Sequence, residues 1–197
     1  MTHKSPKIIF FGTEDYSLGT LQALVGAGFR VSDVLTKPDA ARGRGQKITE
    51  SPVKTYALAH NIPVMTPAKL RDITEDIRAL QPVAGILVAY GKIIPQSIIN
   101  LFEPGIINLH PSLLPRWRGP SPIEAAISHS DTETGVTIMK LEAAMDAGPI
   151  YVQKSIPLTG TETKPELYET LFSLGNSLLI DTLPAILSGK LTPTPQT

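Results

Sequence analysis

The sequence predicts an α/β protein with a doubly wound, mostly parallel sheet and an antiparallel edge. Up to about residue 130, short apolar runs alternate with stretches that have the spacing of amphipathic helices, which is typical of parallel strands joined by crossover helices. Beyond that point, residues 134–142 and 150–157 have the pattern of two consecutive strands, which predicts the antiparallel edge. The length of 197 residues and the hydrophobic content of 42% suit one compact domain, with two small domains as the alternative.

Local signals place the elements along the chain. Ser51 is an N-cap followed by proline at the first helical position, so a helix is predicted from there to about His60. Gly26 and Gly28 end the first helix. The alternation over residues 136–140 predicts that their strand is half-exposed. We expect strands at 7–11, 31–36, 62–65, 83–90, 105–110, 134–142 and 150–157, a polar loop at 37–47, and helices over 18–25, 51–60, 70–80, 95–101, 122–128 and 164–190, the last interrupted by Pro184.

Composition excludes several classes of protein. Lys+Arg and Asp+Glu number 18 each, so the net charge does not indicate a nucleic-acid binder, although a local basic patch could still serve as one. The absence of cysteine excludes disulfides and thiolate sites, and the four histidines lack the spacing of zinc ligands, so no metal is predicted. No signal peptide is evident, and no apolar run approaches the roughly 20 residues that span a bilayer. We therefore expect a cytoplasmic protein without a membrane partner.

The stretch from Ile107 to Ile127 joins a buried strand to a rigid loop. Asn108 and His110 are two residues apart at the carboxyl end of this strand, so both side chains point to the same face. Ligands gather at such strand ends in open α/β sheets. Asn donates a hydrogen bond without a change of charge, whereas His can also hold a proton near neutral pH. Two interpretations are open: the pair satisfies local backbone groups, or it belongs to a polar reaction site.

The loop after this strand favours a reaction site. Four prolines between residues 111 and 122 restrict the backbone, which suits a loop that must hold one shape. Gly119 permits a backbone geometry closed to other residues. Nothing around Ser112 matches G-x-S-x-G, so we do not expect a serine nucleophile, and the nucleophile of an acyl transfer should come from the substrate. Trp117 either stacks on a substrate base or packs over the loop.

An acidic partner for His110 is expected from "MDAGPI", residues 145–150. Asp146 and Gly148 are turn residues, so an ordinary turn is one interpretation. The other is that Asp146 returns to His110 and holds it charged, because a carboxylate favours the protonated form of a neighbouring imidazole. His110 would then donate strongly to a developing oxyanion. Asn108, His110 and Asp146 together predict an acyl-transfer site without its own nucleophile.

Several motifs taken together resemble those of the 10-formyltetrahydrofolate-dependent formyltransferases. They are N-x-H at 108–110, "SLLPRWRGPSPI" at 112–123 and "TGVTIMKLEAAMDAG" at 134–148. "FFGTEDYSLGTLQAL", "TKPDAARGRGQK", "SPVKTYA" and "VAYGKIIP" also look like segments of the branch that acts on methionyl-tRNA. The resemblance covers nearly the whole chain from about Lys7, and it implies that family's Rossmann-like α/β fold. The combined pattern is far more specific than N-x-H alone.

The resemblance implies an enzyme that transfers the formyl group of 10-formyltetrahydrofolate to the α-amino group of initiator methionyl-tRNA. By that resemblance, Asn108 and a protonated His110 stabilise the oxyanion, and Asp146 supports the histidine. Part of the folate co-substrate is expected to contact the backbone at the end of the strand that runs to residue 90. The folate-binding residues implied are Ser112, Leu113, Leu114, Pro115, Val88, Ala89 and Tyr90.

The basic loop at 37–47 distinguishes the possible acceptors. By the resemblance, Arg42, Arg44 and Lys47 contact tRNA phosphates, although short basic loops are also common on solvated surfaces. One alternative is formylation of a small amine, such as an amino sugar nucleotide or glycinamide ribonucleotide, for which a basic loop has little use. Another is a noncatalytic nucleotide-binding module, which needs no oxyanion site. "GTEDYS" stands where a dinucleotide-binding protein has G-x-G-x-x-G, so no dinucleotide is predicted.

Residues 1–190 are expected to form one formyltransferase catalytic domain. The segment "LTPTPQT", residues 191–197, has the composition of an extended linker. The resemblance implies that this linker leads to a C-terminal tRNA-binding domain absent from this chain. The partners implied are initiator methionyl-tRNA and the folate co-substrate, and we expect a monomer.

Overall fold

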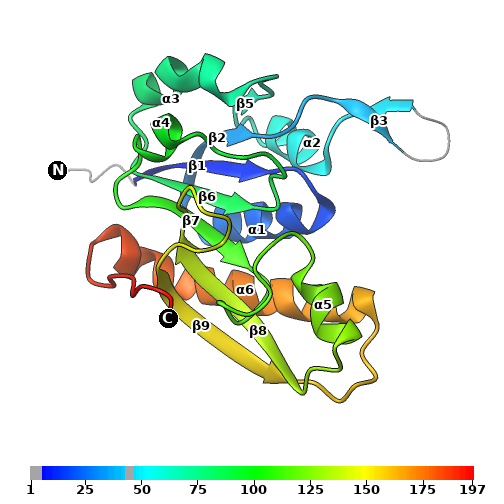
Figure 1. Cartoon of the computed structure of the whole chain (residues 1–197). Coiled ribbons are helices and arrows are strands. Elements are labelled where there is room, and N and C mark those ends of the chain that lie inside the picture. The colour runs from blue at the N-terminus through cyan, green and yellow to red at the C-terminus, as the bar shows by residue number, and fades with distance from the viewer. Residues whose placement is uncertain (1–5, 43–46) are drawn as a thin grey trace. The chain divides into compact units, whose positions relative to one another are not determined.

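The computed structural model describes residues 6–42 and 47–197, without the side chains of residues 41, 42 and 47. The chain divides into two compact units, residues 1–105 and residues 106–197 (Figure 1). Each unit has its own strands and helices. The three residues predicted to be catalytic all belong to the second unit.

The first unit is built on four parallel strands in the order β5–β2–β1–β6. Residues 8–11 form an uninterrupted apolar run and are fully buried, as expected for a strand covered on both faces. The predicted parallel strands are therefore confirmed in this unit. Its strands are β1 (Lys7–Gly12), β2 (Arg30–Leu35), β5 (Val64–Met65) and β6 (Ala84–Val88), with a separate antiparallel pair, β3 (Ala40–Arg42) and β4 (Lys47–Thr49).

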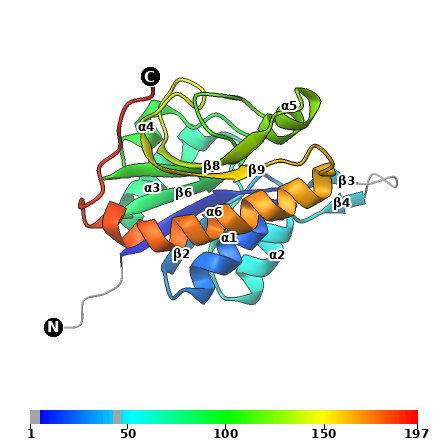
Figure 2. The same cartoon turned by 90° about the horizontal axis from the view of Figure 1, so that it is seen from below.

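Helices cover both faces of this parallel sheet, which makes it doubly wound. Figure 2 shows α1 and α2 on one face and α3 and α4 on the other. The predicted N-cap of α2 is confirmed, because the Ser51 hydroxyl accepts a hydrogen bond from Lys54 N at 3.1 Å and Pro52 is the first helical residue. The helices of the unit are α1 (Asp15–Gly26), α2 (Pro52–Ala59), the 3-10 helix η1 (Leu70–Ile73), α3 (Thr74–Leu80) and α4 (Gln96–Ile99).

The second unit is antiparallel. Strand β7 pairs with β8, and β8 pairs with β9, in both cases antiparallel, which confirms the predicted antiparallel strands. Helix α6 packs against β8, β9 and α5. The elements of this unit are β7 (Gly105–His110), α5 (Pro122–Ser128), β8 (Glu133–Lys140), β9 (Ile150–Pro157) and α6 (Lys164–Leu187).

Strand β7 divides its side chains between two environments. Leu109 faces α6, where a Cβ added to Gly175 would lie 2.8 Å from Leu109 Cδ1, so a glycine is needed for helix and strand to approach this closely. Successive residues of a strand point to opposite faces. Asn108 and His110 therefore lie on the face away from α6, as the two-residue spacing predicts.

Strand β8 is buried on both faces, and the prediction that it is half-exposed was wrong. Residues 134–139 are all buried. Helix α6 covers one face, and the loop after β7 covers the other, where the Thr137 hydroxyl donates a hydrogen bond to Ser112 O at 2.6 Å. A threonine whose hydroxyl is satisfied within the protein can be buried, so the polar residues in this run did not mark solvent. The half-exposed strand is β9.

Helix α6 runs without interruption from Lys164 to Leu187, so the prediction that Pro184 breaks it was wrong. Proline removes one backbone hydrogen bond, but the last turns are held by burial of Leu183 and Ile186. In the described part of the chain α6 is the one helix long and apolar enough to cross a membrane by length and composition alone. Its buried residues recur along one face that packs against β8 and β9, as in the core helix of a globular unit.

Three segments of the first unit differ from the sequence-based expectation. The predicted loop at 37–47 contains strand β3 and the first residue of β4, and Arg42 pairs with Lys47. Backbone pairing needs no apolar pattern, so a polar, glycine-rich segment gave no strand signal. The predicted helix at 70–80 begins as the 3-10 helix η1, and the one at 95–101 is reduced to Gln96–Ile99.

Candidate active site

Strand β7 delivers Asn108 and His110 to a nearly closed environment. Each residue is 5% exposed. Across the strand pair, His110 lies opposite Thr137 of β8. The carboxamide of Asn108 can both donate and accept a hydrogen bond without a change of charge.

The imidazole of His110 is held between two acceptors. Its Nε2 lies 3.0 Å from the carbonyl oxygen of Trp117. A carbonyl can only accept, so Nε2 carries the proton of this hydrogen bond. On the other side, His110 Nδ1 lies 3.8 Å from Asp146 Oδ2, which is within ion-pair distance but too long for a hydrogen bond. Asp146 therefore lies beside His110, which agrees with the second of the two interpretations given for residues 145–150.

The turn that carries Asp146 is fixed from several sides. Asp146 has φ +47°, in the left-handed region, and its Oδ2 accepts a hydrogen bond from Gly119 N at 2.8 Å. A Cβ on Gly148 would clash with the carbonyl oxygen of Lys140, so this position requires glycine. The side chain of Gln196 donates to Asp146 O and to Gly148 O, both at 2.8 Å. The carboxylate thus has a defined place, set by backbone groups.

The carbonyl that binds His110 is itself positioned by a surface cluster. Trp117 has φ +59°, and its indole N–H donates to Asp131 Oδ2 at 2.7 Å. Arg116 donates to both oxygens of the same carboxylate, and the Trp117 ring packs against His129 with centroids 4.4 Å apart. The hydrogen bond from Arg116, followed by that from Trp117, keeps the pKa of Asp131 below its ordinary value despite partial desolvation. Of the two interpretations of Trp117, these contacts favour packing over the loop.

The predicted folate segment Ser112–Pro115 is held by its own hydrogen bonds. The Ser112 hydroxyl donates to the carbonyl oxygen of Arg116 at 2.7 Å and not to a basic side chain. Thr137 Oγ1 accepts from Leu114 N at 3.2 Å, and Gln153 Nε2 donates to Leu114 O at 2.8 Å. Ser112 and Leu114 are buried, Leu113 is half-buried and Pro115 is exposed, and the Leu114–Pro115 peptide bond is cis. Any folate contact with this segment stays a prediction.

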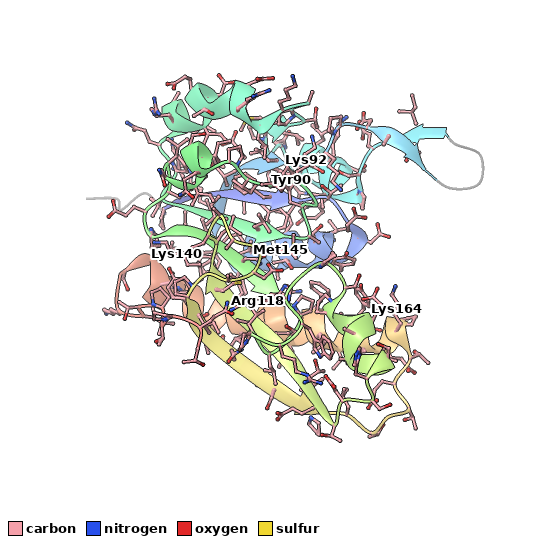
Figure 3. The ribbon with its side chains drawn as sticks, in the orientation of Figure 1. Tyr90, Lys92, Arg118, Lys140, Met145 and Lys164 are labelled. Atoms are coloured by element: carbon pink, nitrogen blue, oxygen red, sulfur yellow. The ribbon has the colours of Figure 1, made fainter. Side chains whose placement is uncertain are left out.

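The second predicted folate segment, 88–90, lies in the first unit at the end of β6. Ala89 has φ +45°, and Tyr90 O accepts a hydrogen bond from Thr13 Oγ1 at 3.2 Å. Figure 3 labels Tyr90 and Lys92, the latter donating to Pro67 O at 2.9 Å. The Tyr90 hydroxyl is buried without a hydrogen-bond partner among the described residues, and burial raises the pKa of this phenol to about 12. It is thus an unused donor and acceptor.

Two of the predicted tRNA-binding residues, Arg42 and Lys47, belong to the paired strands β3 and β4. Arg42 is the last residue of β3 and Lys47 the first of β4. Their side chains, and Arg44 altogether, lie outside the described residues. Ile48, next to Lys47, is 72% exposed, so the described part of this strand pair includes a large apolar side chain in solvent.

Sequence reasoning missed the groups that position the site. Thr137 and Gln153 hold the loop at Leu114, the Trp117 carbonyl orients His110, and Gln196 holds the Asp146 turn. Gln196 belongs to the segment predicted as a linker, whose composition carries no signal of a side chain that reaches a turn 50 residues earlier. A backbone carbonyl leaves no mark in the sequence at all.

The fold and this site define the class: an α/β protein with a polar Asn–His–Asp set where β7 ends. The chain belongs to the formyl transferase family, because the profile described as "Formyl transferase" matches residues 7–183. This confirms the resemblance stated from the motifs. Methionyl-tRNA formyltransferase of Chloroflexus aurantiacus (strain J-10-fl) is 42% identical over 192 residues, which are 96% of this chain and 62% of that protein. The protein of the same name from Myxococcus xanthus is 42% identical over 97% of this chain and 62% of its own length.

Solved structures are similar in fold. Glycinamide ribonucleotide transformylase 1 from Symbiobacterium toebii has a TM-score of 0.81 at 19% identity, covering 98% of this chain and 95% of that one. The N-formyltransferase from Helicobacter canadensis, in complex with folinic acid and dTDP-3-aminofucose, has a TM-score of 0.74 at 21% identity. The likeness covers 98% of this chain and 68% of that one. These likenesses confirm the predicted α/β fold. The chain spans about 62% of the length of the curated relatives it matches.

Proposed function

We propose that this chain transfers the formyl group of 10-formyltetrahydrofolate to the α-amino group of methionyl-tRNA. One observation carries the choice of acceptor: relatives named methionyl-tRNA formyltransferase are 42% identical over 96–97% of the chain. Solved glycinamide ribonucleotide formyltransferases are only 19–22% identical to this chain. The ion-pair distance of 3.8 Å between His110 Nδ1 and Asp146 Oδ2 supports the chemistry. A cytoplasmic location follows from this proposal, because the acceptor belongs to translation.

The reaction needs no enzyme nucleophile. The uncharged amine of methionyl-tRNA attacks the formyl carbon, a C–N bond forms, and the carbonyl oxygen becomes an oxyanion. The intermediate collapses by cleavage of the bond between the formyl carbon and N10 of the folate. The proton lost by the amine is balanced by the proton gained at N10. The site therefore has to stabilise the oxyanion and assist one proton transfer.

Asn108 is assigned as an oxyanion donor. Asn108 is 5% exposed and lies on the same face of β7 as His110, so its amide N–H group can donate to an oxyanion that forms beside the imidazole. Such preorganised donors act where water is excluded and typically contribute about 2.7–4 kcal/mol each to lowering the barrier. The charge of the amide does not change, so the donor is ready at every pH at which the substrate amine is uncharged.

His110 is assigned as the second donor, with Asp146 behind it. In the structure Nε2 is bonded to Trp117 O. We propose that Nε2–H exchanges this carbonyl for the oxyanion, because an ionised acceptor makes a stronger hydrogen bond than a neutral one. Asp146, at 3.8 Å from Nδ1, then stabilises the positive charge of the doubly protonated ring. Distances at active sites are often long without substrate and shorten in the reacting complex.

The folate co-substrate is assigned to two segments, each ordered within its own unit. Backbone groups of Val88, Ala89 and Tyr90 suit the donor and acceptor edge of a pterin. Ser112, Leu113, Leu114 and Pro115 are assigned a shape-holding role toward folate, since the hydroxyl of Ser112 is already bonded within the loop. Arg42, Arg44 and Lys47 are assigned to tRNA phosphates, each a contact whose strength falls with salt.

A direct assay tests the acceptor. Purified protein is incubated with 10-formyltetrahydrofolate and either methionyl-tRNA, glycinamide ribonucleotide or an amino sugar nucleotide, and the formylated product is measured. We expect formyl-methionyl-tRNA and no formylated small amine. Formylation of a small amine without formylation of methionyl-tRNA would overturn the proposed acceptor, and no transfer to any acceptor would overturn the reaction.

A further inference from the structure

Gln196 makes four hydrogen bonds around the turn that carries Asp146. Its side-chain NH2 donates to Asp146 O and to Gly148 O, both at 2.8 Å. Its side-chain oxygen accepts from Arg118, at 3.0 Å from Nε and 2.6 Å from Nη2. Every polar group of the carboxamide is thus used. A surface glutamine with no role in the fold would share these groups with water.

The two carbonyls that Gln196 binds report the shape of the turn. They converge on one NH2 group because Asp146 has the left-handed φ of +47°. This conformation is unfavourable for a residue with a side chain and persists where surrounding contacts determine it. The same conformation places Asp146 Oδ2 against Gly119 N at 2.8 Å and within 3.8 Å of His110 Nδ1. A contact that fixes the backbone of Asp146 therefore also fixes its carboxylate.

The backbone around Gln196 is itself anchored. Thr194 N donates to Ile150 O at 2.8 Å, and Ile150 N donates to Thr194 O at 2.8 Å. Ile150 is the first residue of β9 and follows the Asp146 turn by four positions. This two-way bridge delivers Gln196 to the turn. Residues 194–196 thus pack on the second unit, although their composition predicts a linker.

Arg118 ties the same glutamine to the loop that follows β7. Figure 3 labels Arg118 and Met145, the residues that precede Gly119 and Asp146. Met145 Sδ lies 4.0 Å from the position of a Cβ on Gly119, so the loop and the turn are in contact here. Through Arg118 and Gly119, the Asp146 turn is bonded to the loop whose Trp117 carbonyl holds His110.

We propose that Gln196 is a positioning residue of the formyl transfer reaction: it holds the Asp146 turn so that the carboxylate lies behind His110. The proposal rests on the proposed function and deepens it. Gln196 touches neither reacting atom, so it acts through Asp146. Its loss should lower the rate of the chemical step while substrate binding stays the same.

Gln196→Glu tests the donors, because glutamate has the same shape and can still accept from Arg118 but cannot donate to the two carbonyls. Gln196→Met removes the polar groups without adding charge. It provides the same test if the glutamate variant fails to fold. With either variant we expect kcat to fall about tenfold to a hundredfold, since two partly buried hydrogen bonds that hold the Asp146 turn are lost. The KM for methionyl-tRNA and for 10-formyltetrahydrofolate should stay within about twofold of wild type. Thr192→Ala, an exposed change in the same segment, is the matched control and should leave both constants unchanged.

A second measurement is independent of activity. The Gly119 amide is bonded to the Asp146 carboxylate, so its hydrogen exchange, measured by NMR, reports where that carboxylate lies. In both Gln196 variants the amide hydrogen of Gly119 should exchange faster than it does in wild type and in Thr192→Ala. Unchanged exchange, unchanged kcat, or a rise of KM in place of a fall of kcat would each overturn the positioning role. A wild-type chain that transfers no formyl group contradicts the proposed function instead, and the exchange measurement then still decides whether Gln196 holds the turn.

Discussion

Replacing Asp146 with asparagine removes a charge while keeping the shape of the site. The Asn carboxamide oxygen can still accept from Gly119 N, which lies 2.8 Å from Asp146 Oδ2, so the turn should stay in place. What changes is the interaction with His110, whose Nδ1 lies 3.8 Å from that oxygen. The variant therefore isolates the electrostatic contribution of the carboxylate to a positively charged imidazole.

The size of the effect follows from the distance. Two unit charges 3.8 Å apart interact by about 4 kcal/mol at an effective dielectric constant of about 20. The Asp146 side chain is 16% exposed, so solvent reduces this value. We take about 2–3 kcal/mol as the loss of transition-state stabilisation, which corresponds to a fall in kcat of about 30- to 150-fold.

The assay is single-turnover formyl transfer to methionyl-tRNA with saturating 10-formyltetrahydrofolate, so that the chemical step is observed. Asp181→Asn, which removes an exposed carboxylate from α6, is the matched control and should transfer at the wild-type rate. Circular dichroism and the melting temperature confirm that Asp146→Asn is folded. A folded Asp146→Asn protein with the wild-type single-turnover rate would refute the role of this charge.

Three further predictions concern the amide, the turn and the loop. Asn108→Ala should lower kcat about a hundredfold, since one oxyanion donor is lost. Asn100→Ala, at an exposed position, is the control. Equal rates in the two variants would contradict the assignment of Asn108. Gly148→Ala should lower the free energy of unfolding by about 1–3 kcal/mol, because its Cβ meets the backbone oxygen of Lys140, and a denaturant melt that matches wild type would refute this. The pKa of Asp131 is lowered in the folded protein, so its charge stabilises the fold above pH of about 4 and loses this effect as the pH falls further. Asp131→Asn should therefore be less stable than wild type by about 1 kcal/mol at pH 7, and this difference should shrink as the pH is lowered below about 4. A difference that persists unchanged in acid would exclude this cause.

The sequence predicted most strands well because their signals are local. The apolar run at residues 8–11 and the strand Gly105–His110 were predicted within a residue or two of their bounds. The prediction failed where burial depends on partners far away in the chain. Strand β8 is covered on both faces by α6 and by the loop after β7, and neither contact can be read from residues 133–140.

The site was predicted in part for the same reason. Asn108 and His110 share a face because a strand alternates, and this is a local rule. Asp146 was proposed as a partner of His110 from its chemistry and from family resemblance, and the structure brings the two within 3.8 Å. The roles of the Trp117 carbonyl and the Gln196 side chain were not predicted. Every residue has a backbone carbonyl, so the sequence does not show which one binds His110, and a glutamine does not indicate which distant groups it will contact.

The order of side chains along the chain therefore determined which groups are available for chemistry: an amide, an imidazole and a carboxylate, with no nucleophile among them. Tertiary structure decided how they are held. The left-handed backbone at Asp146, the Gly119 amide and the bonds from Gln196 fix the carboxylate, and a carbonyl anchored through Asp131 orients the imidazole. These contacts join residues that lie up to 50 positions apart, so they exist only after the chain has folded.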